Sequence, residues 1–247
     1  MLLRKLITRS IVQIAVLGAL LFVSAGTLDW WRAWVLLGVF FVGTVASLID
    51  LYPDHKDLLQ ERLKSPLQKD QPLVDKMVLV PFLVLFLGLF VLIPLDLFRW
   101  HLLPPPAPPV SWVGLALLPF GWCAAHFSLR HNPYAALVVK HQQARSQTVV
   151  DSGIYGIVRH PMYAGAIFFM LGIPLWLGSY AGTLLVIAMI LLLALRIVLE
   201  ERFLRGKLPG YEAYMRKVRY RSFPGSGKPD YAQCPRHQGF ATAKVCR

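Results

Sequence analysis

The sequence predicts an all-α integral membrane protein with about five to six transmembrane helices. Of its 247 residues, 56% are hydrophobic and only 16% are charged, whereas soluble domains carry about 25% charged residues. The apolar residues gather in long runs, several of which approach the roughly 20 residues that a helix needs to cross a bilayer. The basic residues alternate with these runs: 24 of the 26 Lys and Arg fall within residues 1–10, 53–76, 130–160 and 196–247. The positive-inside rule places these four segments in the cytoplasm.

The net charge of +13 would also suit a nucleic-acid-binding protein, because Lys and Arg neutralise phosphates. Its distribution argues otherwise, since only Arg32 and Arg99 lie in the segments predicted to face the opposite side. The charge therefore indicates topology, and no nucleic-acid partner is expected. Attraction to anionic membrane lipids is a by-product of the same charge.

The first apolar run, Ile7–Thr27, has three basic residues at or before its start (Arg4, Lys5 and Arg9) and is compatible with a transmembrane helix. It is also compatible with a secretory signal, because Val23-Ser24-Ala25 is an acceptable cleavage site. The second run, Ala33–Leu51, is predicted to span the membrane. Tryptophans at its start are typical of the membrane interface: Trp30, Trp31 and Trp34.

Residues 53–76 are polar and basic, and their three prolines exclude a long helix. The third run, Met77–Leu97, is predicted to cross the membrane. A proline-rich stretch at 104–109 then predicts a stiff extended connector on the outer side. The fourth run, Trp112–Leu129, returns the chain to the cytoplasm.

Two further apolar runs follow the polar residues 130–160. Met162–Leu177 is short, and only Gly178-Ser179 separates it from Tyr180–Leu199, so the two are predicted to form a tight helical hairpin. Six spans with both termini in the cytoplasm satisfy the charge distribution, as do four or five spans with a re-entrant piece. The chain is amphipathic and basic to about Phe223, and residues 225–247 are predicted to be disordered.

The first polar cluster that could carry chemistry runs from Asp151 to Tyr163. Pro161 opens the apolar helix at a position where its missing N–H costs nothing. The start of that helix offers free amide donors and a partial positive charge, which suit a carboxylate. An ordinary interfacial helix start, with Arg159 reaching toward water, explains the same residues.

The second cluster is the pair Glu200-Glu201 at the cytoplasmic end of the last run. Acids at membrane depth are costly and tend to be functional. Adjacent helical residues point about 100° apart, so the two glutamates cannot share one role. Glu200 could pair with Arg196 one turn earlier, which leaves Glu201 to face a cavity and bind an amino group or ribose hydroxyls. Solvation of both acids at the interface is the alternative, although the helix dipole disfavours it.

The third cluster lies in the basic tail and contains Tyr211, Tyr214, Arg219 and Arg221. Alternating aromatic and cationic residues could line a nucleotide pocket, but an amphipathic interfacial helix carries the same residue types.

Cys234, His237 and Cys246 supply three potential zinc ligands where a structural site needs four, so no metal site is predicted.

The three polar clusters form an ordered pattern. Gly-x-Tyr-x-x-Val-Arg-His-Pro-x-Tyr-x-Gly spans 153–165, a Glu-Glu pair follows the hairpin, and Tyr-x-x-Tyr-x-x-x-Val-x-x-Arg-x-x-Pro spans 211–224. In this order and spacing the sequence resembles the isoprenylcysteine carboxyl methyltransferase and phospholipid methyltransferase superfamily, especially its bacterial members. The resemblance covers roughly residues 110–224. It divides the chain into N-terminal helices and connectors (1–110), a methyltransferase core (111–224) and a tail (225–247).

This resemblance implies a cytoplasmic cofactor pocket, formed by the last membrane helices and the tail, that binds S-adenosylmethionine. It also implies a lipophilic acceptor reached from the bilayer and a first span that is kept uncleaved. The implied cofactor-binding residues are Tyr155, His160, Pro161, Tyr163, Glu200, Glu201, Tyr211 and Tyr214. The implied catalytic residues, which hold the acceptor or the cofactor carboxylate, are Arg159, Arg219 and Arg221.

The predicted function is therefore methyl transfer in an inner-membrane-type protein with cytoplasmic termini. A carboxylate acceptor needs only an Arg to orient it, whereas an amine needs a base such as His160 or a glutamate. The sequence supplies both kinds of group, so it leaves the acceptor open, as it does the oligomeric state. Two alternatives are a membrane reductase, for which the sequence has no NADPH-binding signature, and a non-catalytic membrane scaffold.

Overall fold

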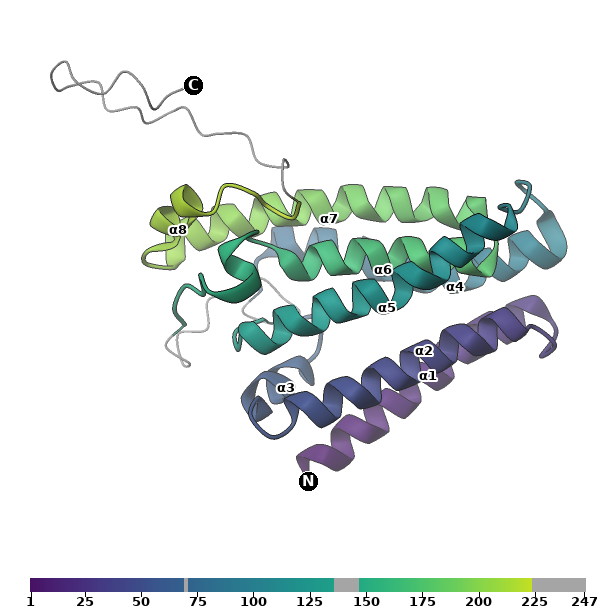
Figure 1. The fold of residues 1–247 in the computed structure, drawn as a ribbon, viewed down its shortest axis with the longest axis horizontal. Coiled ribbons are helices and arrows are strands. Elements are labelled where there is room, and N and C mark those ends of the chain that lie inside the picture. Colours follow the sequence, from purple (N-terminus) through teal and green to yellow (C-terminus); the bar gives the residue numbers. More distant parts are fainter. Residues whose placement is uncertain (69–70, 136–146, 224–247) are drawn as a thin grey trace, which may run out of the picture.

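Long apolar runs become helices in a bilayer because each backbone N–H and C=O must find its partner within the segment itself. The computed structural model describes residues 1–68, 71–135 and 147–223 (Figure 1). Five of its helical segments are long and apolar enough to cross a membrane. They are α1 (Leu2–Ala25), α2 (Trp31–Leu51), α4 (Leu73–Leu95) with its continuation, α5 (Pro108–His131) and α7 (Tyr180–Lys207). The shorter apolar helix α6 (Pro161–Leu177) packs among them, and the predicted all-α membrane fold is confirmed.

Several helix boundaries differ from the predicted ones. Helix α1 begins before its first basic residues, and α7 extends eight residues beyond the predicted end at Leu199, so both glutamates lie within the helix. Helix α5 begins at Pro108, which shortens the predicted proline-rich connector, because proline is tolerated in the first helical turn. Helix α4 continues as a π-helical turn, η1 (Asp96–Trp100), that ends at His101 in a left-handed conformation.

The short elements gather at one end of the bundle. The N-terminus, α3 (Lys56–Arg62), the 3-10 turn η3 (Gly153–Gly156) and α8 (Tyr211–Lys217) all lie there (Figure 1). The turns that join α1 to α2, α4 to α5 and α6 to α7 lie at the other end. Arg32 belongs to that second end, where its Nη1 group donates to the Trp176 carbonyl at 3.3 Å. The elements of the four basic segments therefore lie at one end of the bundle, as predicted, and Arg32 lies at the other.

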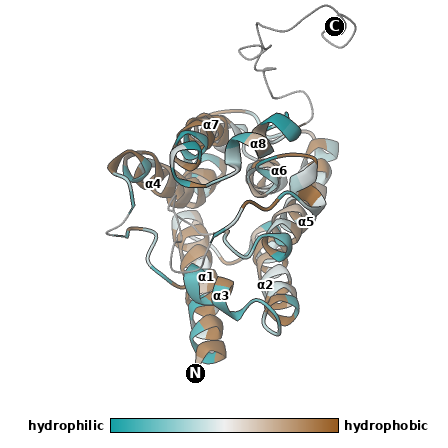
Figure 2. Cartoon of the chain, turned by 90° about the vertical axis from the view of Figure 1, so that its left-hand side faces the viewer, coloured by the Kyte–Doolittle hydropathy of each residue, from teal (hydrophilic) through white to brown (hydrophobic). Residues whose placement is uncertain are grey.

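Apolar side chains cover the outside of the long helices as well as the inside. Figure 2 shows α4 and α7 as largely hydrophobic and α8 as hydrophilic. Large apolar residues such as Ile49 and Leu191 are 71% and 67% exposed in the isolated chain. Such side chains suit contact with lipid and not with water, which agrees with membrane embedding.

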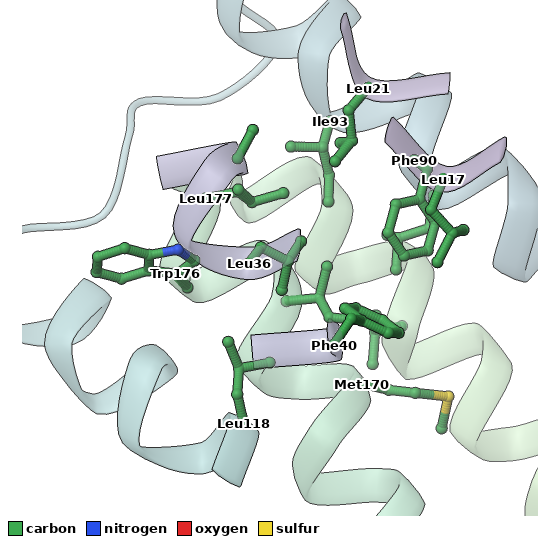
Figure 3. Close-up of a cluster of buried hydrophobic side chains, with 14 of the residues drawn as sticks. Leu17, Leu21, Leu36, Phe40, Phe90, Ile93, Leu118, Met170, Trp176 and Leu177 are labelled. Carbon is green, nitrogen blue, oxygen red and sulfur yellow. The ribbon is translucent and has the colours of Figure 1, made fainter. Parts of the chain in front are cut away.

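The main apolar core lies where α1, α2, α4, α6 and α7 meet. Leu21, Leu36, Phe90 and Ile93 are completely buried in it (Figure 3). The ring of Phe40 packs edge-on against Phe90 and against the ring of Phe169 in α6. Through these contacts the N-terminal helices support the helical hairpin that carries the polar motifs.

Helices α5 and α6 approach each other through glycines. Gly114 and Gly121 in α5 face Gly165 and Gly172 in α6, and each pair is seven residues, or about two turns, apart. A Cβ atom on Gly121 would lie 2.4 Å from the Phe169 backbone nitrogen and 2.6 Å from the Gly165 oxygen. Small residues of this kind let membrane helices pack backbone against backbone. This contact fixes the start of α6, where the first polar motif ends.

We expect Gly121→Ala to destabilise the protein by about 1–3 kcal/mol, because the added methyl group must push two backbones apart. A thermal melt in detergent would measure this as a lower Tm. Gly38→Ala is the matched control, since a Cβ atom there meets nothing within 4 Å. Equal melting temperatures for the two variants would show that the close packing of α5 and α6 contributes little to stability.

Candidate functional site

A cavity lies at the end of the bundle that carries η3 and α8. Its walls come from the end of α5, the segment 147–150, the first polar motif, the last turns of α7, and α8. The predicted site residues that line it are Tyr155, Arg159, His160, Tyr163, Glu200, Tyr211 and Tyr214. Residues from all three sequence clusters thus meet around a single cavity.

The first and third clusters are joined through their backbones. Val158 and Tyr220 form an isolated parallel bridge. The Arg159 amide donates to the Tyr220 carbonyl at 2.9 Å, and the His160 amide donates to the Arg221 carbonyl at 2.7 Å. In addition, the Tyr214 hydroxyl donates to the Tyr155 carbonyl at 2.8 Å. These bonds hold residues 214–221 against the start of α6, so the two clusters form one continuous wall.

Glu201 lies behind this wall and is 2% exposed. Its Oε1 atom accepts from Arg159 Nε at 2.8 Å and lies 3.3 Å from His160 Nε2, while its Oε2 atom accepts from Arg221 Nε at 2.9 Å. The Arg159 guanidinium also donates to the Val218 carbonyl at 2.7 Å. A buried carboxylate is tolerated when cations and hydrogen bonds compensate for its lost solvation, as they do here. Glu201 therefore connects α7 to both of the other clusters.

Glu200 has a different environment, because it lines the cavity. The Tyr163 hydroxyl donates to Glu200 Oε2 at 2.6 Å, and the Tyr163 ring stacks on the His160 ring. The sequence interpretation gave the cavity position to Glu201 and paired Glu200 with Arg196. The structure brings Glu200 to the cavity, and Arg196, which also lines the cavity, donates to Asp75 Oδ1 at 3.0 Å.

Residues from the N-terminal half reach the site, and the sequence interpretation missed them. Asp75, in the first turn of α4, is buried and accepts from Gln71 as well as from Arg196. Arg62, at the end of α3, donates to the Ala135 carbonyl at 3.2 Å and contacts Met162 Sδ at 4.0 Å. An acid at the start of an apolar run was a usable signal for Asp75. Arg62 carried no such signal, since its contacts depend on how α3 folds back.

Burial keeps the cavity tyrosines protonated. It raises the pKa of Tyr155 to about 12, and it also raises the pKa values of Tyr211 and Tyr214 above the usual value for a phenol. At neutral pH these side chains are therefore uncharged hydrogen-bonding groups, and none is a tyrosinate base.

The remaining predicted residues lie around the cavity and not on its surface. Pro161 is buried as the first residue of α6, and Arg221 is partly exposed behind the wall. The Arg219 side chain is exposed, although its carbonyl accepts from Arg159 Nη1 at 3.2 Å. The roles predicted for individual residues, including the catalytic role of the three arginines, remain predictions.

Within the described ranges, no group of three or more His, Cys, Asp and Glu residues could hold a metal ion. Cys234, His237 and Cys246 lie outside the described residues, as does the predicted disordered tail at 225–247.

The long apolar helices thus end in a cavity lined by aromatic, acidic and cationic residues, which makes it the candidate small-molecule site of the protein. Residues 110–208 match the family model described as phospholipid methyltransferase. This segment is therefore similar to the superfamily of phospholipid methyltransferases and isoprenylcysteine carboxyl methyltransferases, in agreement with the resemblance seen in the sequence. The match includes the first cluster, both glutamates and the α5–α6 glycine contact.

Two curated proteins are similar to parts of the chain. The cobalt-zinc-cadmium resistance protein CzcN of Cupriavidus metallidurans is 30% identical over 109 residues, which are 44% of this chain and 50% of that protein. The protein-S-isoprenylcysteine O-methyltransferase of Schizosaccharomyces pombe is 34% identical over 84 residues, which are 33% of this chain and 35% of that protein. The chain thus spans half or less of the length of each relative.

We expect Glu201→Ala to lower the stability of the protein by about 3–5 kcal/mol, because it leaves the buried Arg159 guanidinium without its acid. The measurement is the thermal or denaturant-induced unfolding of the purified protein in detergent. Glu212→Ala is the control, since Glu212 is exposed on α8. If Glu201→Ala and Glu212→Ala unfold at the same temperature, the ion-pair network is not a stabilising element.

Proposed function

We propose that the protein is an integral-membrane methyltransferase that uses S-adenosylmethionine to methylate a lipophilic acceptor reached from the bilayer. The observation that carries this proposal is the meeting of three separate motifs around one cavity, two of which lie within the matched methyltransferase segment. The relative from Schizosaccharomyces pombe, named as an O-methyltransferase, supports the same reaction class. Membrane lipids surround the protein, and we propose that the cavity end faces the cytoplasm, as the basic segments predict.

The cavity residues fit the chemistry of this cofactor. The rings of Tyr155, Tyr211 and Tyr214 provide surfaces for a purine. The start of α6 at Pro161 offers free amide groups and a partial positive charge for a carboxylate. Glu200 provides a cavity-lining carboxylate for an amino group or ribose hydroxyls. Donors and acceptors for each part of the cofactor are therefore present.

When bound, S-adenosylmethionine supplies a methyl group already activated by the sulfonium charge, so the protein has mainly to position and protect the reactants. The cavity residues fix the orientation of the acceptor relative to that methyl group. The apolar helices around the site limit the entry of water. Arg159 and Arg221, held by Glu201, keep the wall of the cavity rigid and positively charged.

The acceptor is a carboxylate or an amine. A carboxylate is nucleophilic when ionised and needs only a cation to orient it. An amine has to lose a proton, which His160 or Glu200 could accept, since both line the cavity. The membrane-reductase alternative requires a nicotinamide cofactor, and the scaffold alternative leaves the meeting of the three motifs without a purpose.

The proposal predicts that purified protein in detergent binds S-adenosylhomocysteine, as measured by titration calorimetry. NADPH, titrated in the same way, should give no binding heat. Heat with NADPH and none with S-adenosylhomocysteine would instead favour the reductase, and the absence of heat with both would favour the scaffold.

We further expect Glu200→Gln to weaken S-adenosylhomocysteine binding by about 10- to 100-fold, because a charge-assisted hydrogen bond contributes about 1.5–3 kcal/mol. Glu212→Gln removes a carboxylate from an exposed site and should bind as the unaltered protein does. An unchanged affinity in Glu200→Gln, with normal folding by circular dichroism, would remove Glu200 from the cofactor site.

A further inference from the structure

Arg62 brings a positive charge from the N-terminal half to the edge of the cavity. It is the last residue of α3 and is partly buried. Its Nη1 group donates to the Ala135 carbonyl and contacts Met162 Sδ, and both of these residues line the cavity. A guanidinium carries five N–H donors on three nitrogens. Both contacts use Nη1, so Nε and Nη2 make no hydrogen bond within the described part of the chain.

Arg159 and Arg196 line the cavity and Arg62 lies at its edge, and these three differ in how their charge is compensated. Arg159 pairs with Glu201, and Arg196 pairs with Asp75. For Arg62, no carboxylate among the described residues lies within salt-bridge distance. A partly buried cation without an acid is costly, and an anionic ligand would remove that cost.

The electrostatics around Arg62 are consistent with an uncompensated cation. Burial lowers the pKa of Arg62 to about 10, which still leaves it charged at neutral pH, and the nearby charge of Arg9 acts in the same direction. The positive charge of Arg62 also acts on Tyr155, where it opposes the rise in pKa that burial causes. Tyr155 lines the cavity, so the field of Arg62 reaches into it.

We propose that Arg62 forms an anion-binding subsite that holds the carboxylate or phosphate of the methyl acceptor beside Met162 and Ala135. The identification of the bound anion as the methyl acceptor rests on the proposed function. The existence of the anion site does not. It narrows the substrate class to anionic amphiphiles, in which an apolar chain lies among the membrane helices and an acidic group meets the guanidinium. The planar fork of arginine suits both acidic groups, since each can accept two parallel hydrogen bonds.

Arg62 lies outside the matched segment 110–208. In this arrangement the cofactor is held by the C-terminal half and the acidic group of the acceptor by a short helix of the N-terminal half. Arg62 therefore determines specificity for the acceptor without taking part in cofactor binding.

The test is equilibrium binding of four amphiphiles with the same tail: dodecanoate, dodecyl phosphate, dodecylamine and dodecanol. The protein is placed in phosphatidylcholine nanodiscs, and binding heats are corrected with empty nanodiscs. At least one of the two anions should bind about 10- to 100-fold more tightly than dodecanol, since a hydrogen bond to a charged group contributes that much affinity. Dodecylamine should bind no better than dodecanol. If dodecanoate binds more tightly than dodecyl phosphate, the acidic group of the acceptor is a carboxylate. The reverse order identifies a phosphate.

Arg62→Gln should remove the preference for anions, whereas Arg62→Lys should keep part of it. Both variants should bind S-adenosylhomocysteine as the unaltered protein does, which also shows that they are folded. Arg130→Gln is the matched control, because Arg130 is a half-exposed cation that is paired with Asp50 and does not line the cavity. It should retain the anion preference.

Two results would overturn the anion site: equal binding of all four amphiphiles by the unaltered protein, or an anion preference that persists in Arg62→Gln. Failure of the proposed function gives a different result. In that case S-adenosylhomocysteine does not bind to any form, while the dependence of anion binding on Arg62 remains.

Discussion

A buried carboxylate has to be surrounded by cations and donors, and in this protein that requirement organises the whole site. Glu201 is placed on α7 within the bundle and engages Arg159, His160 and Arg221, which come from segments on both sides of α7 in the sequence. Each of these partners has a second bond that fixes the backbone around it, such as the bond of Arg159 to the Val218 carbonyl. The cost of desolvating one acid thus links residues 218–221, the start of α6 and the last turns of α7. The cavity exists because these three pieces cannot separate without exposing unpaired charge.

The orientation of α6 is the second constraint on the site. Its glycines lie against those of α5, so the two helices are held at backbone contact. The start of α6 carries His160 and Pro161, and its direction decides where the free amide groups point. Packing inside the membrane therefore sets the geometry of a polar site at the end of the bundle. This is a common arrangement in membrane proteins, where small residues at helix contacts take the place of the hydrophobic driving force.

The sequence allowed the membrane fold, the helical hairpin and seven of the eighteen cavity-lining residues to be predicted, because apolar run length and motif spacing are local properties. The assignment of Glu200 and Glu201 depended on helix rotation. Two adjacent residues point about 100° apart, and only tertiary packing decides which of them faces the cavity. Asp75 and Arg62 could not be placed, since a contact between Asp75 and Arg196 spans 121 residues and leaves no periodic pattern. Features that depend on neighbouring residues in one helix were thus predicted well, whereas contacts between helices were not.

The pairing of residues 158–160 with 220–221 also has a consequence for the order of events during synthesis. Residues 220–221 are synthesised after all of the apolar helices of the described chain. The wall of the cavity therefore cannot form until these residues have been made. Chains fold from the N-terminus as they are made. The bundle can therefore assemble in the membrane first, with an open end, and become able to hold a ligand only after translation has passed the last transmembrane segment. A ribosome that stalls before residue 220 would leave an inserted protein with no ligand-holding capacity.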